Sequence, residues 1–328
     1  MGSSAKPPTP STLGSFARSL RQSRFVKNYG TLIVFLLLIG VSACFTPGFL
    51  SAGTLENTLF QGFAVMLVAL GMTLVMSSGG IDISVGSIMA VSAAVAARLY
   101  DADTGLVPSI AAGILAAGLC GLFNGILISK FKIQPIIVTL VTMIECRGLA
   151  QTILGKPSIS FSFTSFNALG HYRIPGTGIP IQVVILVVAV GMMLFVAKKT
   201  VFAKHVEAIG ENPRAARLVG INVVFTTAAV YVLCSILCGV AGIMQAAPTG
   251  NVIANVMGRY VELDAIAAVA IGGTPFSGGR PRILGTVFGA VVVQLITVIV
   301  NMNNIQYEYS LILKAVVLIV AVWAQREK

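Results

Sequence analysis

Long apolar runs separated by short polar segments make up most of this chain. A helix needs about 20 mainly apolar residues to cross the hydrocarbon core of a membrane. The pattern predicts an all-α, polytopic transmembrane bundle of about ten spans. The predicted spans lie near residues 29–46, 58–77, 85–99, 107–128, 134–154, 181–197, 223–246, 263–273 with its flanks, 283–301 and 307–324.

The composition supports lipid as the solvent for most of the chain. Of the 328 residues, 56% are apolar and only 10% are charged, whereas a soluble domain carries about 25% charged residues. Little length remains for a water-soluble domain. We therefore divide the chain into a polar tail, 1–28, and a transmembrane domain, 29–325, which contains one long basic loop at 198–222.

The basic residues predict which loops face the cytoplasm. The formal net charge is +11, but the Lys and Arg residues fall in short loops, so nucleic acid is not an expected partner. With the tail inside, sixteen of them lie in inner segments and three, Lys156, Arg173 and Arg259, in outer loops. Such asymmetry predicts that both termini are cytoplasmic and that the number of spans is even.

Motifs for covalent chemistry are missing from the sequence. There is no G-x-x-x-x-G-K-[ST] segment to cradle phosphate, and the two histidines, His171 and His205, lie far apart. The five cysteines all lie in apolar runs without a C-x-x-C spacing, so we expect neither disulfides nor a metal site. We predict that the chain is no enzyme and holds no cofactor of its own.

Two glycine-rich stretches adjoin the short third and eighth runs. One contains Gly79, Gly80, Asp82 and Ser84, and the other Gly272, Gly273 and Thr274. Irregular backbone at membrane depth survives where protein buries it or where it lines a wet cavity, so such breaks point to a translocation path or its gate. The alternatives are ordinary tight loops and, for Asp82, a residue that caps the next helix.

Several blocks of this sequence, in order over roughly residues 60–325, carry a resemblance. They are Gly79–Ser87, Asn124-Gly125, Lys130, Pro135–Leu140, Arg147-Gly148, Glu207–Gly210, Asn212-Pro213, Ala215–Ile221, Glu262–Ala267, Ile271–Thr274 and Gly278-Gly279.

The ordered set resembles the permease subunits of ribose-type sugar ABC importers, in the branched-chain amino-acid/ribose permease superfamily. The resemblance implies a ten-span permease in the bacterial inner membrane. It would work as a pair of permeases with two ATPase subunits, which bind the ATP, and a periplasmic sugar-binding protein. Selectivity would then be set largely by that binding protein.

The inner loop 198–222 has a pattern of its own. It holds five basic residues, and Pro213 suits the first turn of a helix. Residues 213–220 then form a short helix with Ala215, Leu218 and Val219 on an apolar side. A basic loop against anionic lipid is one interpretation; a coupling helix in a groove of the ATPase is the other. The candidate coupling residues are Glu207, Ala208, Gly210, Asn212, Pro213, Ala215, Arg217, Leu218 and Gly220.

Charges inside spans are functional candidates by default. Arg147 and Lys314 each lie about seven residues from the outer end of a predicted span. They either form structural ion pairs, with Glu308 as one available partner, or contact the translocation path. Asn124 joins them as a path candidate.

An ion-coupled secondary transporter is the alternative class. Such carriers bury carboxylates near the bilayer centre, whereas here Glu145 is the clearest mid-span carboxylate, and Asp82, Glu262 and Asp264 are predicted near loop ends. Within the ABC class, a nucleoside or branched-chain amino-acid permease stays open. The sequence also leaves open the solute and whether the permease pairs with itself or with a sister subunit.

Overall fold

The computed structural model describes residues 35–36, 39–40, 42–44, 46–161 and 164–325. The predicted tail 1–28 and most of the predicted span 29–46 lie outside them. The helices are α3 (Ala52–Ser77), α4 (Val85–Asp101), α5 (Leu106–Ser129), α6 (Pro135–Leu154), α7 (Ser165–His171), α8 (Ile181–Lys199), α9 (Val201–Glu211), α10 (Pro213–Leu218), α11 (Val223–Thr249), α12 (Val261–Ile271), α13 (Ile283–Met302) and α14 (Tyr307–Gln325).

The long helices coincide with the predicted spans. Six of them, α3, α5, α6, α8, α11 and α13, are long and apolar enough to cross a membrane. The third and eighth predicted spans are indeed short, with 17 residues in α4 and 11 in α12. The fold is an all-α bundle of membrane-spanning helices, and the total of ten spans stays a prediction.

Helix α11 lies at the centre of the bundle and packs against α3, α4 and α5. Small residues make this possible. Gly113, Ala117 and Gly121 of α5 are all buried, and a Cβ on Gly121 would overlap the Ser235 hydroxyl of α11. Close approach of this kind stabilises helix pairs in lipid, where burial of apolar surface gives little drive.

Helices α3–α6 and α11–α14 repeat one order of helix lengths. Each set begins with a helix of 26 or 27 residues, continues with a short one, and ends with two of 19 to 24. The start of α3 and the end of α11 lie at the same end of the molecule, because Glu56 pairs with Arg173 just beyond α7, and Gly170 of α7 packs on Pro248. The two sets therefore run in opposite directions.

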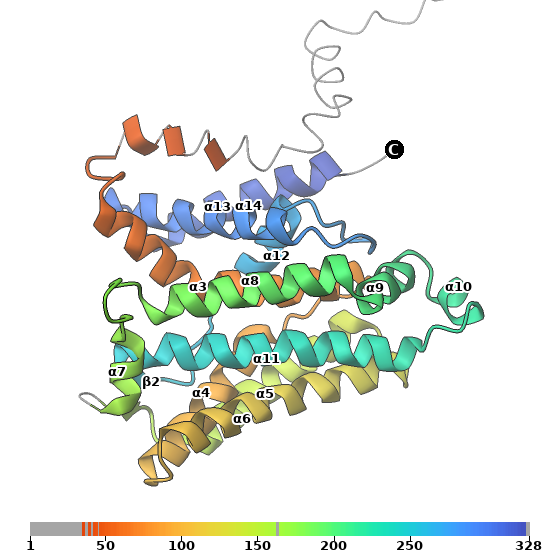
Figure 1. The fold of residues 1–328 in the computed structure, drawn as a ribbon, viewed down its shortest axis with the longest axis horizontal. Coiled ribbons are helices and arrows are strands. Elements are labelled where there is room, and N and C mark those ends of the chain that lie inside the picture. The colour runs from red at the N-terminus through yellow and green to blue at the C-terminus, as the bar shows by residue number, and fades with distance from the viewer. Residues whose placement is uncertain (1–34, 37–38, 41, 45, 162–163, 326–328) are drawn as a thin grey trace, which may run out of the picture.

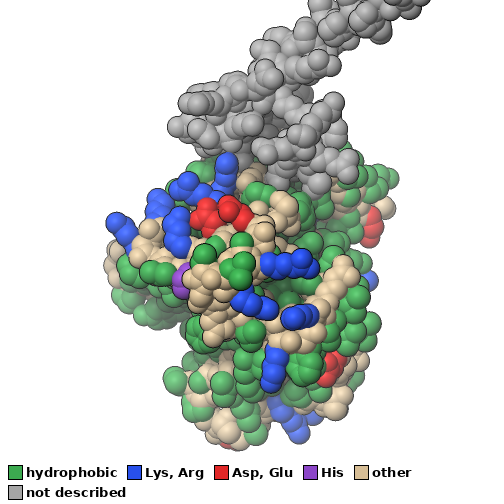
Figure 2. Space-filling view, turned by 90° about the vertical axis from the view of Figure 1, so that its right-hand side faces the viewer, with side chains coloured by type: hydrophobic (Ala, Val, Ile, Leu, Met, Phe, Trp, Pro, Cys, Tyr) green, Lys and Arg blue, Asp and Glu red, His purple; other side chains and the backbone are tan. Residues whose placement is uncertain are grey.

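The connections gather at two ends (Figure 1). The α10 end holds α9, α10 and the segments 78–84 and 272–282, and Gly279 N–H donates to Ser77 O at 2.9 Å. The α7 end holds α7 and the antiparallel strands β1 (Ile159–Ser160) and β2 (Asn251–Val252). The segments 78–84, 198–222 and 272–282, which were predicted to lie on one side of the membrane, thus lie at one end of the molecule. Figure 2 looks onto the α10 end, where many Lys and Arg side chains gather.

Two predicted loops contain helices that the sequence analysis missed. Residues 201–211, taken as part of the loop 198–222, form α9, with Ala203, Val206 and Ile209 buried. Their spacing of three residues is the amphipathic pattern of a helix on a protein surface. The long polar loop 155–180 contains α7, in which Phe166 is buried.

Candidate functional site

The start of α4 is held by a chain of buried polar groups. Ser84 is the N-cap residue of α4, and Asp82 Oδ1 accepts from its N–H at 2.9 Å and from its hydroxyl at 2.5 Å. Asn124 Nδ2 donates to Ser84 Oγ at 2.9 Å, and Thr142 donates to Asn124 Oδ1 at 2.6 Å. Thr142 lies about 10 Å along α6 from Pro135, so this series of hydrogen-bonded polar groups lies inside the bundle.

Asp82 does not cap α4 in the predicted way. Its carboxylate fixes the turn that precedes the helix, and Ser84 occupies the capping position. Asp82 is fully buried, and no described group donates to its Oδ2; the buried Tyr231 hydroxyl likewise has no described partner. Tyr231 packs so closely that a Cβ on Gly80 would overlap its hydroxyl. Close packing therefore requires a glycine in this part of segment 78–84.

The start of α12 is held differently. The non-helical segment 250–260 leads from α11 back into the bundle, and Arg147 Nη1 donates to the carbonyls of Ala254 and Met257, both at 2.7 Å. Of the two interpretations for Arg147, an ion pair and a contact with the path, neither anticipated these acceptors, which are backbone oxygens. Gly258 meets Gly86 so closely that a Cβ on either would overlap the other's carbonyl oxygen.

Lys314 forms a buried ion pair. Its Nζ lies 2.8 Å from Asp264 Oδ2 and joins α14 to α12. An ion pair was one of the two interpretations left open for Lys314, and its partner is Asp264 rather than Glu308. Asp264 lies in the first turn of α12, near the loop end where the sequence placed it, and it is buried. The short helix α12 starts deep in the bundle, so its first turn lies among side chains.

Helices α9 and α10 project from the α10 end. Asn212 caps α10 by accepting from the N–H groups of Arg214 and Ala215, and Pro213 occupies its first turn as predicted. The buried residue of α10 is Ala216, not Ala215. Leu218 is 88% exposed, and the following Val219 is 77% exposed.

Gly210 links this projection to both glycine-rich stretches. A Cβ on Gly210 would overlap Ser77 O and lie 2.7 Å from Gly279 N, and Gly210 O also faces Gly278. Gly79 lies at the edge of the same contact. The candidate coupling residue Gly210 therefore lies close to the candidate gate residue Gly79. The sequence alone did not indicate this contact.

The other path candidates lie apart from that contact. Gly272 packs against Gly285 and Thr286 of α13. Gly273 has a φ of +85°, which glycine adopts without strain. Thr274 Oγ1 accepts from Arg282 N–H at 3.1 Å and so closes the segment 274–282. These three residues shape the connection between α12 and α13.

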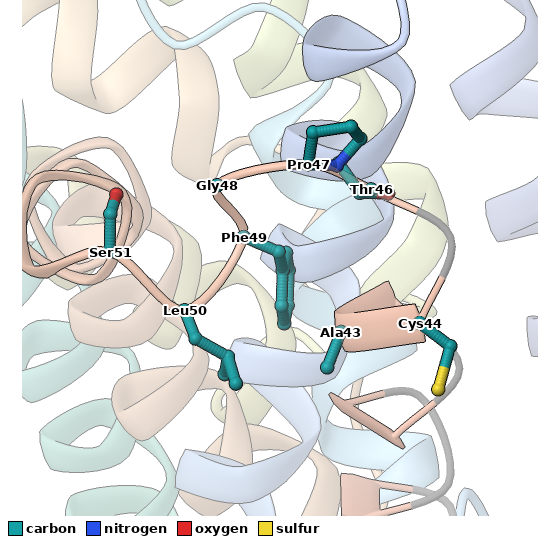
Figure 3. A pocket seen from close by; sticks show the side chains of 8 residues that line it. All are labelled: Ala43, Cys44, Thr46, Pro47, Gly48, Phe49, Leu50 and Ser51. Atoms are coloured by element: carbon teal, nitrogen blue, oxygen red, sulfur yellow. The ribbon is translucent and has the colours of Figure 1, made fainter.

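A shallow pocket lies at the α7 end, before α3 (Figure 3). Its lining contains no charged side chain, and Ser51, at its edge, caps α3 by accepting from Thr54 N–H. It contains none of the predicted site residues. Within the described ranges, no cluster of three His, Cys, Asp or Glu residues could hold a metal ion.

The chain matches a family described as the permease component of branched-chain amino acid transport systems, over residues 54–322. It belongs to this family. The permease is 33% identical to the ribose import permease protein of Escherichia coli strain K12 over 300 residues, covering 91% of this chain and 93% of that one. It is 33% identical to the galactofuranose transporter permease protein of the same strain, with 97% and 95% covered.

A third relative is the L-arabinose ABC transporter permease protein of Azospirillum brasilense, 32% identical with 91% and 87% covered. No solved structure matches the permease. Membership confirms the family resemblance. It makes the chain a translocation subunit rather than an enzyme, and a multi-pass protein of the inner membrane.

Sequence reasoning missed several residues of the site. Thr142 and Tyr231 lie in apolar runs and outside the resemblance blocks, so only their buried polar groups could have drawn attention to them. The carbonyls of Ala254 and Met257 carry no sequence signal at all.

Proposed function

We propose that the permease forms the membrane path of an ATP-driven sugar importer and is driven by separate ATPase subunits. Three relatives are named for ribose, galactofuranose and L-arabinose, which favours a monosaccharide as solute. ATP is bound by the partner subunits, and a periplasmic sugar-binding protein delivers the solute. A second copy of the permease or a sister permease completes the path.

The observation that carries this proposal is that the α9–α10 projection has one exposed apolar side and one side packed against the bundle. On one side, Leu218 and Val219 are exposed beyond the end of the bundle. On the other, Gly210 touches the backbone at Ser77 and Gly279. An apolar helix face fits a groove in a partner protein, so a partner that moves α10 also pushes on the connections after α3 and before α13.

The breaks before α4 and α12 are the proposed position of the path. Both short helices begin inside the bundle, where non-helical backbone is tolerated if it is packed against protein or lines a wet cavity. They approach from opposite ends and meet at Gly86 and Gly258. A push at Gly79 reaches Asp82 and Ser84 within five residues along segment 78–84.

The coupling proposal is tested with Leu218→Asp. The permease is co-expressed with its ATP-binding subunit, purified through a tag, and assayed for bound ATPase activity and for sugar uptake in cells. The variant should insert normally because Leu218 lies outside the bundle, yet it should lose the ATPase and stop uptake. Phe131→Asp is the matched control, since Phe131 is also an exposed apolar residue at the α10 end but lies outside α9 and α10.

Full uptake by both Leu218→Asp and Ala215→Asp would contradict a coupling role. Uptake by the permease alone in vesicles, driven by an ion gradient without any ATPase, would establish the ion-coupled alternative. The solute is tested by measuring binding of monosaccharides, nucleosides and branched-chain amino acids to the partner binding protein. Tight binding of only a nucleoside or an amino acid would contradict the sugar assignment.

A further inference from the structure

The segment between α11 and α12 contains buried backbone carbonyls that need hydrogen-bond donors. Residues 250–260 lead into the bundle without forming a helix, and Ala254 and Met257 are 3% and 8% exposed. Backbone N–H groups of the segment and of the first turn of α12 donate to the carbonyls of Ile253, Val256, Gly258 and Tyr260. A carbonyl at membrane depth that lacks a donor costs several kcal/mol, so the carbonyls of Ala254 and Met257 need a donor from elsewhere.

Arg147 supplies that donor from α6. It lies twelve residues after Pro135, or about 18 Å along the helix, and one nitrogen, Nη1, donates to both carbonyls at 2.7 Å. Hydrogen bonds from a charged donor are stronger than neutral ones. One turn further along α6, Gln151 Nε2 donates to Asn255 Oδ1 at 2.5 Å. Two positions of α6 therefore hold the same turn.

When the turn 253–258 is held in this position, it fixes the starts of both α4 and α12. Gly258 has a φ of +67° and its backbone lies against Gly86, the second residue of α4. Glu262, in the first turn of α12, lies beside Gly86 as well, so that a Cβ there would be 2.7 Å from its Oε2. A shift of the turn by even an ångström would change this backbone contact.

We propose that Arg147 is a positioning residue for translocation: it holds the turn 253–258 against Gly86 and so keeps the starts of α4 and α12 in register. This inference rests on the proposed function of the permease as a translocation subunit. Arg147 acts through the turn, and its two carbonyl bonds are what keep the turn closed.

The chemistry of the two bonds predicts an order of substitutions. Because one nitrogen makes both bonds, the ammonium of Arg147→Lys can replace it. The amide of Arg147→Gln is shorter and can donate to one carbonyl at most. Arg147→Met has a side chain as long as that of Gln and donates to neither. Closure of the turn should therefore decrease in the order Arg, Lys, Gln, Met.

The experiment measures the turn and transport separately, in the assembled importer. Ala254→Cys places a thiol on the buried side of the turn, in a background carrying Cys44→Ser, since Cys44 is an exposed native cysteine. The rate of thiol labelling should rise about tenfold or more with Arg147→Met, because two charged hydrogen bonds are lost. Sugar uptake should fall by a similar factor, Arg147→Gln should lie between, and Arg147→Lys should remain close to the parent.

Thr152→Val is the matched control, since Thr152 is exposed on α6 and its hydroxyl bonds only to Gly148 O of the same helix. It should change neither labelling nor uptake. Parental labelling rates in both Arg147→Met and Arg147→Gln would overturn the proposal. If Arg147→Met fails to insert, Arg147→Gln decides alone. Labelling is measured independently of transport. If the labelling rates follow the expected order but neither the parent nor any variant takes up sugar, the proposed function is refuted and the positioning role of Arg147 still holds.

Discussion

The two short helices, α4 and α12, begin inside the bundle but are anchored by different chemistry. The start of α4 is tied by hydroxyl and amide groups around Asp82, in a chain that ends at Thr142 of α6. The start of α12 is tied by two cations, Arg147 of α6 and Lys314 of α14. Both breaks in the helical order are thus held by α6, and only one of them depends on positive charge.

The difference follows from what each segment leaves unsatisfied. Segment 78–84 carries its own acceptor, Asp82, and neutral donors are sufficient for it. Segment 250–260 carries buried carbonyls and leads to Asp264, a buried carboxylate, so a strong donor must come from another helix. Hydrogen bonds to charged groups contribute about 1.5–3 kcal/mol and neutral ones about 1 kcal/mol. The bonds of Asn124 and Thr142 in the α4 chain are neutral, whereas every bond from Arg147 and Lys314 is charged. The α12 start should therefore be the more sensitive of the two to single substitutions.

The largest effect is expected at the buried ion pair. Lys314→Met leaves Asp264 buried without its cation and should lower the unfolding free energy by about 3–5 kcal/mol. Adding Asp264→Leu should restore most of that loss, because an apolar pair needs no desolvated charge. The measurement is SDS titration of the purified permease in micelles. The exposed pair of Lys156 and Asp101 is the control, and Asp101→Asn should cost less than about 1 kcal/mol.

Next in size is the contact between the two helix starts. Gly86→Ala should cost about 1–3 kcal/mol, because its Cβ would overlap Gly258 O and backbone must move. Gly118→Ala on α5 is the matched control. Its Cβ would lie 3.6 Å from Ile236 Cγ1, an ordinary contact, so this variant should be neutral or slightly stabilising. Equal melting temperatures for the two variants would show that the helix starts do not constrain each other.

A smaller effect is expected in the neutral chain at α4. Thr142→Val keeps the shape of the side chain but removes the donor to Asn124 Oδ1, which should cost about 1–2 kcal/mol. The hydroxyl of Thr152 bonds only within its own exposed helix, so Thr152→Val should cost less than about 0.5 kcal/mol. If Thr142→Val lowered the unfolding free energy as much as Lys314→Met does, the distinction between neutral anchoring of α4 and charged anchoring of α12 would be wrong.

The smallest effect on stability is expected at Asp82. In Asp82→Asn the amide oxygen can still accept from Ser84, and the amide nitrogen replaces Oδ2, so the cost should be less than about 1 kcal/mol. Asp82→Leu, which loses both bonds, should cost more. Sugar uptake is measured beside stability. A well-folded Asp82→Asn variant without uptake would show that the negative charge itself takes part in translocation.

The helices were the predictable part of this fold. Apolar run length placed α5 and α6 within one residue of their observed ends, with Pro135 opening α6 and the left-handed Gly155 following it. Local chemistry determines these features, and local chemistry is what a sequence displays.

The partners of the site residues were the unpredictable part. Arg147 bonds to carbonyls 107 and 110 residues away, and Lys314 finds Asp264 across 50 residues. Any residue type could have supplied those carbonyls, so no pattern marks them. The loop 198–222 was expected to carry one short helix, and α9 was missed because its apolar positions were read as loop. Tertiary packing decides the partners of Arg147 and Lys314, whereas the spacing of the apolar residues in α9 was a local signal that was overlooked.

The bond from Arg147 to Ala254 also sets a problem for the synthesis of the protein. Arg147 is made 107 residues before its acceptor, which at 5–20 residues per second is an interval of roughly 5–20 s. During this time α6 must enter the membrane, or wait beside it, with a guanidinium group that the finished protein satisfies only later. The insertion machinery therefore has to keep this helix hydrated or sheltered until the second half of the chain arrives.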